Sequence, residues 1–306
     1  MGLDLAREES VSAIAEAVLN YCNTISDQTS IAGIWKGFGE LGLFSLPELF
    51  GECACAASCA AMEVLGRKGL GGPFADTLAF TACASAEMLE PVVSGDVIAC
   101  LGQLPLIPLP ERSSIHVTEI NGEAVLLDIT SVVPVDMMDG DRWVRAQASP
   151  GKVLGPFAPW ADRYDIAISG WLVGAGLELI EAASAHASQR VQFGKTIGEF
   201  QAVSAPLARA VMSLDSAKVL AEAAAVRLDA GDSSLVTAAR WSAARAAEQA
   251  AITAHQTYGA FGVLEDGPVF GRSRRIRQLA TQFPQERLVD AEAALGNRSL
   301  GLVERN

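Results

Sequence analysis

The sequence predicts a mainly α-helical protein with a small β domain between two helical domains. Apolar residues recur at helical spacing along roughly the first 90 residues, short β-rich runs with turn signals follow, and long alanine-rich helical segments fill the rest. We therefore expect an N-terminal helical domain over residues 1–92 and a reduced β domain over residues 93–160. A C-terminal four-helix bundle would occupy residues 161–306.

The N-terminal domain is predicted from four amphipathic segments separated by glycine and proline, at residues 11–19, 34–43, 53–68 and 75–89. The second segment contains the glycine spacing of a dinucleotide-binding loop, from Gly37 to Gly42. That spacing binds a pyrophosphate only where a strand leads into a helix. Here it lies inside a predicted helix that follows another helix, so we predict no dinucleotide site.

The middle domain is predicted from four β-rich runs, at residues 96–101, 114–120, 123–129 and 143–147. Asn121-Gly122 and Asp139-Gly140 separate successive runs, and Asn-Gly is the dipeptide typical of a tight hairpin. The C-terminal bundle is predicted from helical periodicity at residues 171–189, 198–230, 233–258 and 285–295. Its alanine content favours helix and lets neighbouring helices approach closely.

Composition excludes several classes of function. The chain has 36 acidic residues against 23 Lys plus Arg, a formal charge of −13, which repels nucleic acid. Its longest apolar run, residues 166–180, is too short to span a membrane, and the charged N-terminus does not resemble a secretory signal. We expect a cytoplasmic protein whose six cysteines are mostly small buried side chains in a reducing environment.

The common catalytic motifs are missing from the sequence. His116, His186 and His255 fall in three different segments, without a second ligand at helical spacing, so no metal site is predicted. Neither a nucleophile elbow nor a Walker loop occurs, which leaves hydrolase and NTPase functions without supporting residues.

The most informative stretch is residues 190–201, Arg-Val-Gln-Phe-Gly-Lys-Thr-Ile-Gly-Glu-Phe-Gln. A helix is expected to end near Arg190, a short turn to pass through Gly194, and a new helix to begin around Gly198. Free N–H groups at a helix start, together with a guanidinium that can hold two phosphate oxygens, suit a pyrophosphate. The alternative is an ordinary helix–helix turn with a solvated arginine.

This run resembles the Arg-x-x-Phe-Gly-x-x-Ile-x-x-Phe-Gln signature of the acyl-CoA dehydrogenase family. Glu63 to Gly66 resembles the family's Glu-x-x-Gly helix, and Gln256 to Gly262 resembles its Gln-x-x-Gly-Gly-x-Gly turn. The resemblance covers both helical domains and implies an acyl-CoA dehydrogenase-like fold. In that family FAD lies across a subunit boundary, and the contacts implied here belong to its adenosine and pyrophosphate half. These cofactor contacts are Arg190, Gln192, Phe193, Gln256, Gly259 and Gly262.

Two departures from the family pattern concern the flavin ring and the catalytic base. The family's Thr-Glu-Pro-Gly-x-Gly-Ser-Asp loop and Trp-Ile-Thr-Asn-like strand hold the ring, and neither occurs here; the first is replaced by residues 102–106. The usual position of the catalytic glutamate falls at Phe283, which cannot accept a proton. The alternative glutamate position of some members falls at about Tyr164, and Asp165 beside it is the remaining candidate base.

This combination resembles the short, base-lacking subunit of heteromeric acyl-CoA dehydrogenases known from bacterial steroid side-chain degradation. The resemblance implies that a larger subunit supplies the catalytic glutamate and the contacts to the flavin ring, in an α2β2 assembly acting on an acyl-CoA such as a steroid-CoA. Two alternatives stay open: a self-sufficient homomeric dehydrogenase that uses Asp165 or another acid, and a flavin-free assembly protein. A basic cluster is formed by Arg272, Arg274, Arg275 and Arg277. Three roles are open for it: pairing with an acidic face of a partner, contact with a cofactor phosphate, or exposure to solvent in a loop.

Overall fold

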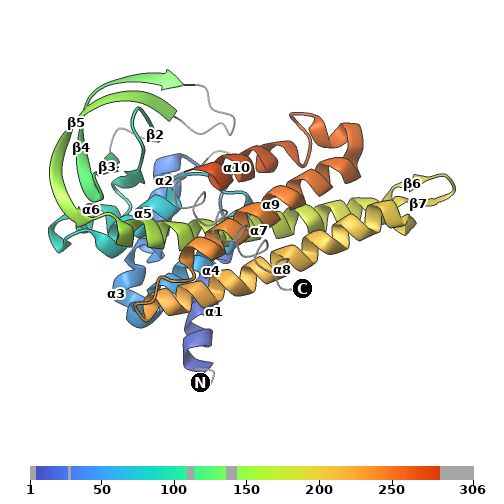
Figure 1. The fold of residues 1–306 in the computed structure, drawn as a ribbon, viewed down its shortest axis with the longest axis horizontal. Helices are drawn as coiled ribbons and strands as arrows, with labels where there is room; N and C mark the ends of the chain where they lie inside the picture. Colours follow the sequence, from blue (N-terminus) through green and yellow to red (C-terminus); the bar gives the residue numbers. More distant parts are fainter. Residues whose placement is uncertain (1–4, 27–28, 109–113, 136–142, 283–306) are drawn as a thin grey trace, which may run out of the picture.

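The computed structural model describes residues 5–26, 29–108, 114–135 and 143–282 of the 306-residue chain. Figure 1 shows a β sheet at one end of an elongated helical body, as the sequence predicted. The N-terminal helices are α1 (Leu5–Cys22), α2 (Ile31–Glu40), α3 (Leu46–Phe50), α4 (Ala54–Lys68), α5 (Phe74–Cys83) and α6 (Glu90–Val93). Short 3-10 turns connect several of them: η1 (Leu43–Ser45), η2 (Gly51–Cys53) and η3 (Ala86–Met88).

Gly37 and Gly39 of the dinucleotide-like pattern lie inside helix α2, where they allow close packing, and Gly42 follows the helix with a φ of 86°. A Cβ on Gly37 would lie 1.9 Å from the hydroxyl of Tyr21 in α1, and a Cβ on Gly39 would lie 2.5 Å from the backbone of Ser94. Both glycines therefore let neighbouring segments approach the helix. Because the pattern forms no loop between a strand and a helix, it has no geometry for a pyrophosphate.

The middle domain is one five-stranded sheet in the order β1-β3-β4-β5-β2. Its strands are β1 (Ile98–Leu101), β2 (Leu106–Pro108), β3 (Ser114–Ile120), β4 (Glu123–Val135) and β5 (Trp143–Pro156). Strand β1 pairs parallel to β3, and all other pairings are antiparallel. Asn121 and Gly122 have φ of 54° and 83°, the left-handed conformation that a tight Asn-Gly hairpin requires.

The sheet differs from the prediction in strand length and number. Strands β4 and β5 extend beyond the predicted runs, because their outer halves pair with each other and do not need an apolar face. Strand β2 was not predicted: it has three residues and exists through its pairing with β5. The predicted turn at Asp139-Gly140 lies outside the described residues.

The C-terminal helices are α7 (Ala158–Gln189), α8 (Gln201–Asp229), α9 (Val236–Tyr258) and α10 (Phe270–Thr281). A hairpin of β6 (Val191–Gln192) and β7 (Lys195–Thr196) and the turn η4 (Ile197–Glu199) join α7 to α8, while η5 (Gly259–Val263) follows α9. Helix α10 was not predicted, because its four arginines leave only a weak apolar pattern in the sequence. In the structure, α7 and α9 bury the apolar face of this helix. The helix predicted at residues 285–295 lies outside the described residues.

Helix α7 is the core element of the protein. It packs against α4, α5, α8, α9 and α10. Among the described residues, two helical segments are long and apolar enough to cross a membrane: Leu43–Lys68 and α7 itself, of which 83% of the apolar window is buried within the protein. The apolar length of α7 thus serves internal packing.

Glycines let α7 and α4 approach until their backbones touch. A Cβ on Gly170 would lie 2.2 Å from the carbonyl oxygen of Cys59, and a Cβ on Gly174 would lie 1.9 Å from that of Glu63. On the facing helix, a Cβ on Gly66 would lie 2.0 Å from the carbonyl oxygen of Trp171. A side chain at any of these positions must push the helices apart, since backbone atoms cannot rotate away.

We predict that Gly174→Ala destabilises the protein by at least about 2 kcal/mol, because overpacking against backbone outweighs the helix propensity gained. Urea denaturation measures the change. The matched control is Gly271→Ala in α10, where an added Cβ meets nothing within 4 Å, so its free energy of unfolding should stay equal or rise slightly. Equal stability of the two variants would contradict the backbone contact.

Candidate functional site

The sequence-predicted residues Arg190, Gln192 and Phe193 lie on the hairpin at the end of the bundle opposite the sheet (Figure 1). Arg190 ends α7 with an extended ψ of 117°, and its carbonyl oxygen accepts a 2.8 Å hydrogen bond from Ile197 N. Phe193 and Gly194 have φ of 53° and 84° and turn the chain back. The expected short turn is therefore a two-stranded hairpin, because both tip residues adopt the left-handed conformation.

The second predicted set, Gln256, Gly259 and Gly262, lies at the same end of the bundle. Tyr258 stacks on His186 with ring centroids 4.4 Å apart, which joins the end of α9 to the end of α7. Gly259 has a φ of 61°, and Gly262 is buried with a Cβ position 2.9 Å from Tyr258. Glycine is thus needed at the first position for its backbone conformation and at the second for packing.

An exposed apolar patch surrounds these predicted residues. The side chain of Phe193 is 92% exposed, and its ring contact among the described residues is an edge-to-face contact with Phe200. Other exposed apolar side chains on the hairpin and after α9 are Val191, Phe261, Val263 and Leu264. Exposed apolar residues that gather at one end of a protein mark a surface that another molecule covers.

A different candidate site lies at the opposite end of the protein, between the sheet and α10. It is a cavity of about 340 Å³. The segment that replaces the family's ring-binding loop forms one wall, and the remaining walls come from the start of β5 and the end of α10. The lining residues are Leu101, Gly102, Gln103, Leu104, Pro105, Leu106, Trp143, Gln278, Thr281 and Gln282. We call this the sheet-end pocket.

Polar atoms without partners gather at the sheet-end pocket. Trp143 Nε1, both amide atoms of Gln278 and Gln282 Oε1 are buried and have no hydrogen-bond partner within the described part of the chain. A buried polar group that stays unpaired costs about 1–3 kcal/mol. Together these groups offer two donor atoms and two acceptor atoms to a ligand with a polar edge. The volume of the cavity is within the usual range for ligand pockets.

A buried ion pair holds one wall of this pocket. Arg240 Nε in α9 lies 3.5 Å from Asp165 Oδ1 in α7, and the two side chains are 0% and 1% exposed. Arg240 Nη2 donates to the carbonyl oxygen of Leu279 and, at 3.3 Å, to that of Gln282. Burial lowers the pKa of the Arg240 guanidinium, and the charge of Asp165 opposes that shift. The pair therefore fixes the last turn of α10.

A second buried carboxylate holds the facing wall. Asp76 in α5 accepts a 2.8 Å hydrogen bond from the amide of Leu101 at the end of β1. Thr77 beside it donates to the carbonyl oxygen of Ala99 at 2.9 Å. The two walls of the sheet-end pocket are thus tied to the helical core through buried polar side chains.

The two predicted positions for a catalytic base have different outcomes. Asp165, the candidate base, is paired with Arg240 and does not line the sheet-end pocket. This placement favours a structural role, since a general base must reach its proton directly or through one water. Phe283, the usual base position, lies outside the described residues.

The predicted basic cluster docks α10 onto the N-terminal domain. Arg272 donates to the carbonyl oxygen of Arg67 at 3.0 Å, and Arg275 donates to that of Gly72 at 3.2 Å. The other two arginines approach glutamates of the same chain: Arg274 lies 3.9 Å from Glu265, and Arg277 lies 4.0 Å from Glu248. Contacts inside the chain thus explain the cluster.

Sequence reasoning missed Arg240, Trp143, Gln278 and Gln282. One signal pointed to the first of them: Arg240 interrupts an alanine-rich face of α9 whose other members are buried. A charged residue on such a face requires a buried partner. No comparable signal marks the other three residues, because only the approach of β5 to α10 makes them neighbours.

The fold and part of the chain match known proteins. Residues 165–282 match the family model for the C-terminal domain of acyl-CoA dehydrogenases. The chain is 28% identical over 208 residues to acyl-CoA dehydrogenase IpdE2 of Mycobacterium tuberculosis, covering 64% of this chain and 65% of that protein. Curated relatives at 30% and 31% identity match over only 41% and 31% of their own length, so the chain spans less than half of them.

Solved structures share the whole fold. A structure of PigA with FAD and proline has a TM-score of 0.78 at 19% identity and covers 99% of this chain and 100% of its own. The ChsE4–ChsE5 complex from Mycobacterium tuberculosis has a TM-score of 0.70 at 18% identity, covering 96% and 98%. The resemblance to the acyl-CoA dehydrogenase family is therefore confirmed, for the fold of the chain and for its C-terminal sequence.

We predict that Asp165→Asn and Arg240→Gln each lower the free energy of unfolding by about 3–5 kcal/mol, because each leaves a buried charge without its partner. The double variant Asp165→Asn/Arg240→Gln should lose less than the sum of the singles, by about 1–3 kcal/mol. Urea denaturation of all four proteins measures the coupling. Additive losses would show that the two side chains act independently.

Proposed function

We propose that this chain is a subunit of an FAD-dependent acyl-CoA dehydrogenase and supplies the site for the adenosine and pyrophosphate half of FAD to a neighbouring subunit. The proposed contacts are Arg190, Gln192, Phe193, Gln256, Gly259 and Gly262. Their gathering at one end of the bundle supports this assignment. An arginine at an exposed hairpin can hold a pyrophosphate with two hydrogen bonds at once.

The separation of the two candidate sites carries the proposal. Arg240 and Asp165 lie beside the sheet-end pocket, whereas Arg190 follows Asp165 by 25 residues of helix α7. At 1.5 Å per residue that is roughly 37 Å, longer than an extended dinucleotide. A single FAD cannot reach the hairpin and the sheet-end pocket of the same chain. The hairpin is therefore useful only to a flavin whose ring another subunit holds.

An unpaired face of α8 supports a partner subunit. Leu214, Ala217, Ala221 and Ala224 bury one face of this helix. The opposite face carries exposed apolar side chains seven residues apart, at Met212, Val219 and Val226. Such spacing is typical of a helix that packs along another helix. We assign this face to a larger acyl-CoA dehydrogenase subunit, and an α2β2 assembly would bury it.

The residues at the sheet-end pocket fit the ring of a flavin, and this would be a different flavin from the one whose phosphates the hairpin holds, because one FAD cannot reach both sites. The indole N–H of Trp143 and the amides of Gln278 and Gln282 provide donors and acceptors at the rim of a cavity of about 340 Å³. When bound, FAD would accept the hydride that leaves the β-carbon of an acyl-CoA. The chain's own residues would hold the ring and exclude water, and a carboxylate of the partner would take the α-proton.

The substrate proposed for the assembly is an acyl-CoA. A steroid-CoA is proposed by analogy with the heteromeric members that the sequence resembles. A self-sufficient enzyme that uses Asp165 is the weaker candidate, because that carboxylate is buried against Arg240 and does not line the sheet-end pocket.

We predict that Arg190→Ala lowers the FAD content of the complex purified with its partner about tenfold or more, since a charge-assisted contact to a phosphate is lost. Absorbance at the flavin band against total protein measures the content. Arg209→Ala, an exposed arginine on α8, is the matched control and should leave it unchanged. Phe283→Ala should leave turnover nearly intact, and a kcat loss like that of Arg190→Ala would refute the assigned roles.

We predict that Val219→Glu prevents assembly with the larger subunit, because a carboxylate would be buried in an apolar helix contact. Size-exclusion chromatography with light scattering on co-expressed chains measures the assembly. Ser233→Glu, exposed in the loop after α8, is the control and should assemble normally. Assembly of both variants would remove the assignment of this face.

A further inference from the structure

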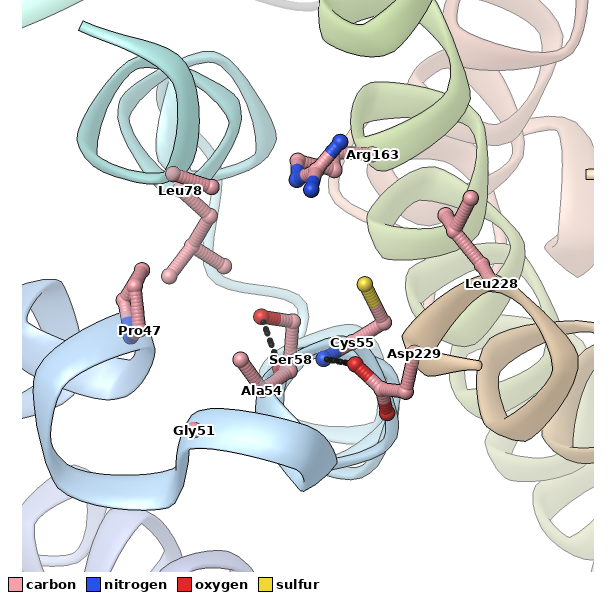
Figure 2. A pocket seen from close by; sticks show the side chains of 10 residues that line it. Pro47, Gly51, Ala54, Cys55, Ser58, Leu78, Arg163, Leu228 and Asp229 are labelled. Atoms are coloured by element: carbon pink, nitrogen blue, oxygen red, sulfur yellow. Dashed lines mark hydrogen bonds between the residues drawn. The ribbon is translucent and has the colours of Figure 1, made fainter. Parts of the chain in front are cut away.

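A second cavity, of about 150 Å³, lies among the helical domains and is separate from both candidate flavin sites (Figure 2). It is built by α3 and η2, the start of α4, one face of α5, the first turns of α7 and the end of α8. Its lining includes four residues with polar side-chain atoms: Cys55, Ser58, Arg163 and Asp229. We call it the α4–α7 cavity.

Most polar groups of the α4–α7 cavity already have partners. The carboxylate of Asp229 accepts hydrogen bonds from the amides of Cys55 at 2.8 Å and Ala56 at 3.1 Å, which caps the start of α4. The hydroxyl of Ser58 donates to the carbonyl oxygen of Ala54 at 2.8 Å. Burial, reinforced by the charge of Asp229, raises the pKa of the Cys55 thiol, which stays neutral. None of these groups needs a ligand.

Arg163 is half-buried and is the cation among the lining residues. Figure 2 shows its guanidinium extending from α7 toward the cavity, on the side facing Ser58 and Cys55. A guanidinium has five donors, and the described contacts of Arg163 use one, to the carbonyl oxygen of Pro159 at 3.2 Å. No described carboxylate lies within 4.0 Å of it, although the chain has 36 acidic residues against 23 basic ones.

Small apolar side chains form part of the remaining wall, although polar atoms make up more of the lining than apolar ones. Pro47, Ala54, Leu78, Ala82 and Leu228 surround the space in front of the guanidinium. A cavity of about 150 Å³ accepts an apolar molecule of the size of benzene, roughly six heavy atoms. A guanidinium group beside a small cavity that is partly lined by apolar side chains matches a compact ligand with a single carboxylate.

We propose that the α4–α7 cavity binds a small monocarboxylate, with its carboxylate on Arg163 and its short apolar tail among Pro47, Leu78 and Ala82. A second carboxylate on the ligand is disfavoured, because it would meet apolar wall or the charge of Asp229. The site is distinct from the sheet-end pocket, since α5 lies between them: Leu78 and Ala82 face this cavity, while Asp76 holds the amide of Leu101 at the other.

Isothermal titration of the full chain with sodium acetate, butanoate, pentanoate, glutarate and phosphate tests the proposal. We expect saturable binding that tightens from acetate to pentanoate, and weaker binding of glutarate and phosphate. Arg163→Gln should weaken pentanoate binding about tenfold or more, through loss of a charge-assisted hydrogen bond. Arg209→Gln on α8 is the matched control and should bind like the unaltered chain.

Ala82→Leu tests the apolar part of the cavity separately, because it fills space without changing charge. It should reduce the affinity for pentanoate more than that for acetate, and circular dichroism checks that both cavity variants are folded. Equal pentanoate affinity of Arg163→Gln and the unaltered chain would overturn the proposal. So would phosphate binding as tightly as pentanoate, or no saturable binding of any carboxylate. These outcomes do not depend on FAD or on a partner subunit.

Discussion

The backbone contact between α7 and α4 is the constraint on which the rest of the structure depends. Glycines at 66, 170 and 174 remove the side chains that would keep the two helices apart, so their carbonyl oxygens and Cα atoms pack directly. This seats α7 in the centre, where α5, α8, α9 and α10 cover its remaining surface. One rigid helix therefore spans the protein, and its two ends position the two candidate sites.

Buried charge determines how the end of α10 meets the sheet. Arg240 reaches across from α9 to the carbonyls that α10 leaves without partners, and Asp165 compensates its charge. Arg272 and Arg275 donate to backbone carbonyls of the N-terminal domain in the same way. Guanidinium groups suit this work, since one planar fork can hold several carbonyl oxygens while keeping its charge. Trp143 Nε1, the Gln278 amide atoms and Gln282 Oε1 have no hydrogen-bond partner within the described residues and belong to the lining of the sheet-end pocket, where a ligand can satisfy them.

The length of α7 separates the hairpin, the proposed phosphate site, from the sheet-end pocket, which supports the proposed sharing of a flavin between subunits. The exposed apolar residues on the hairpin, after α9 and along the outer face of α8 lie where such a neighbour would pack. In this arrangement one subunit can lose its catalytic base and still contribute to the site, because binding and proton transfer come from different chains.

Sequence alone determined the three-part architecture, the Asn-Gly hairpin and the placement of the family motif at a helix end, because periodicity and turn chemistry are local properties. Sequence alone could not predict helix α10 or strand β2, because their apolar patterns are weak. Helix α10 is stabilised by packing on α9, and strand β2 by pairing with β5. Nor could sequence alone pair Arg240 with Asp165, or bring Trp143 beside Gln278, since these residues are far apart in the chain. Only the tertiary structure decided those contacts, because burial creates the need for a partner and the close approach of α7, α9 and α10 selects which partner is within reach.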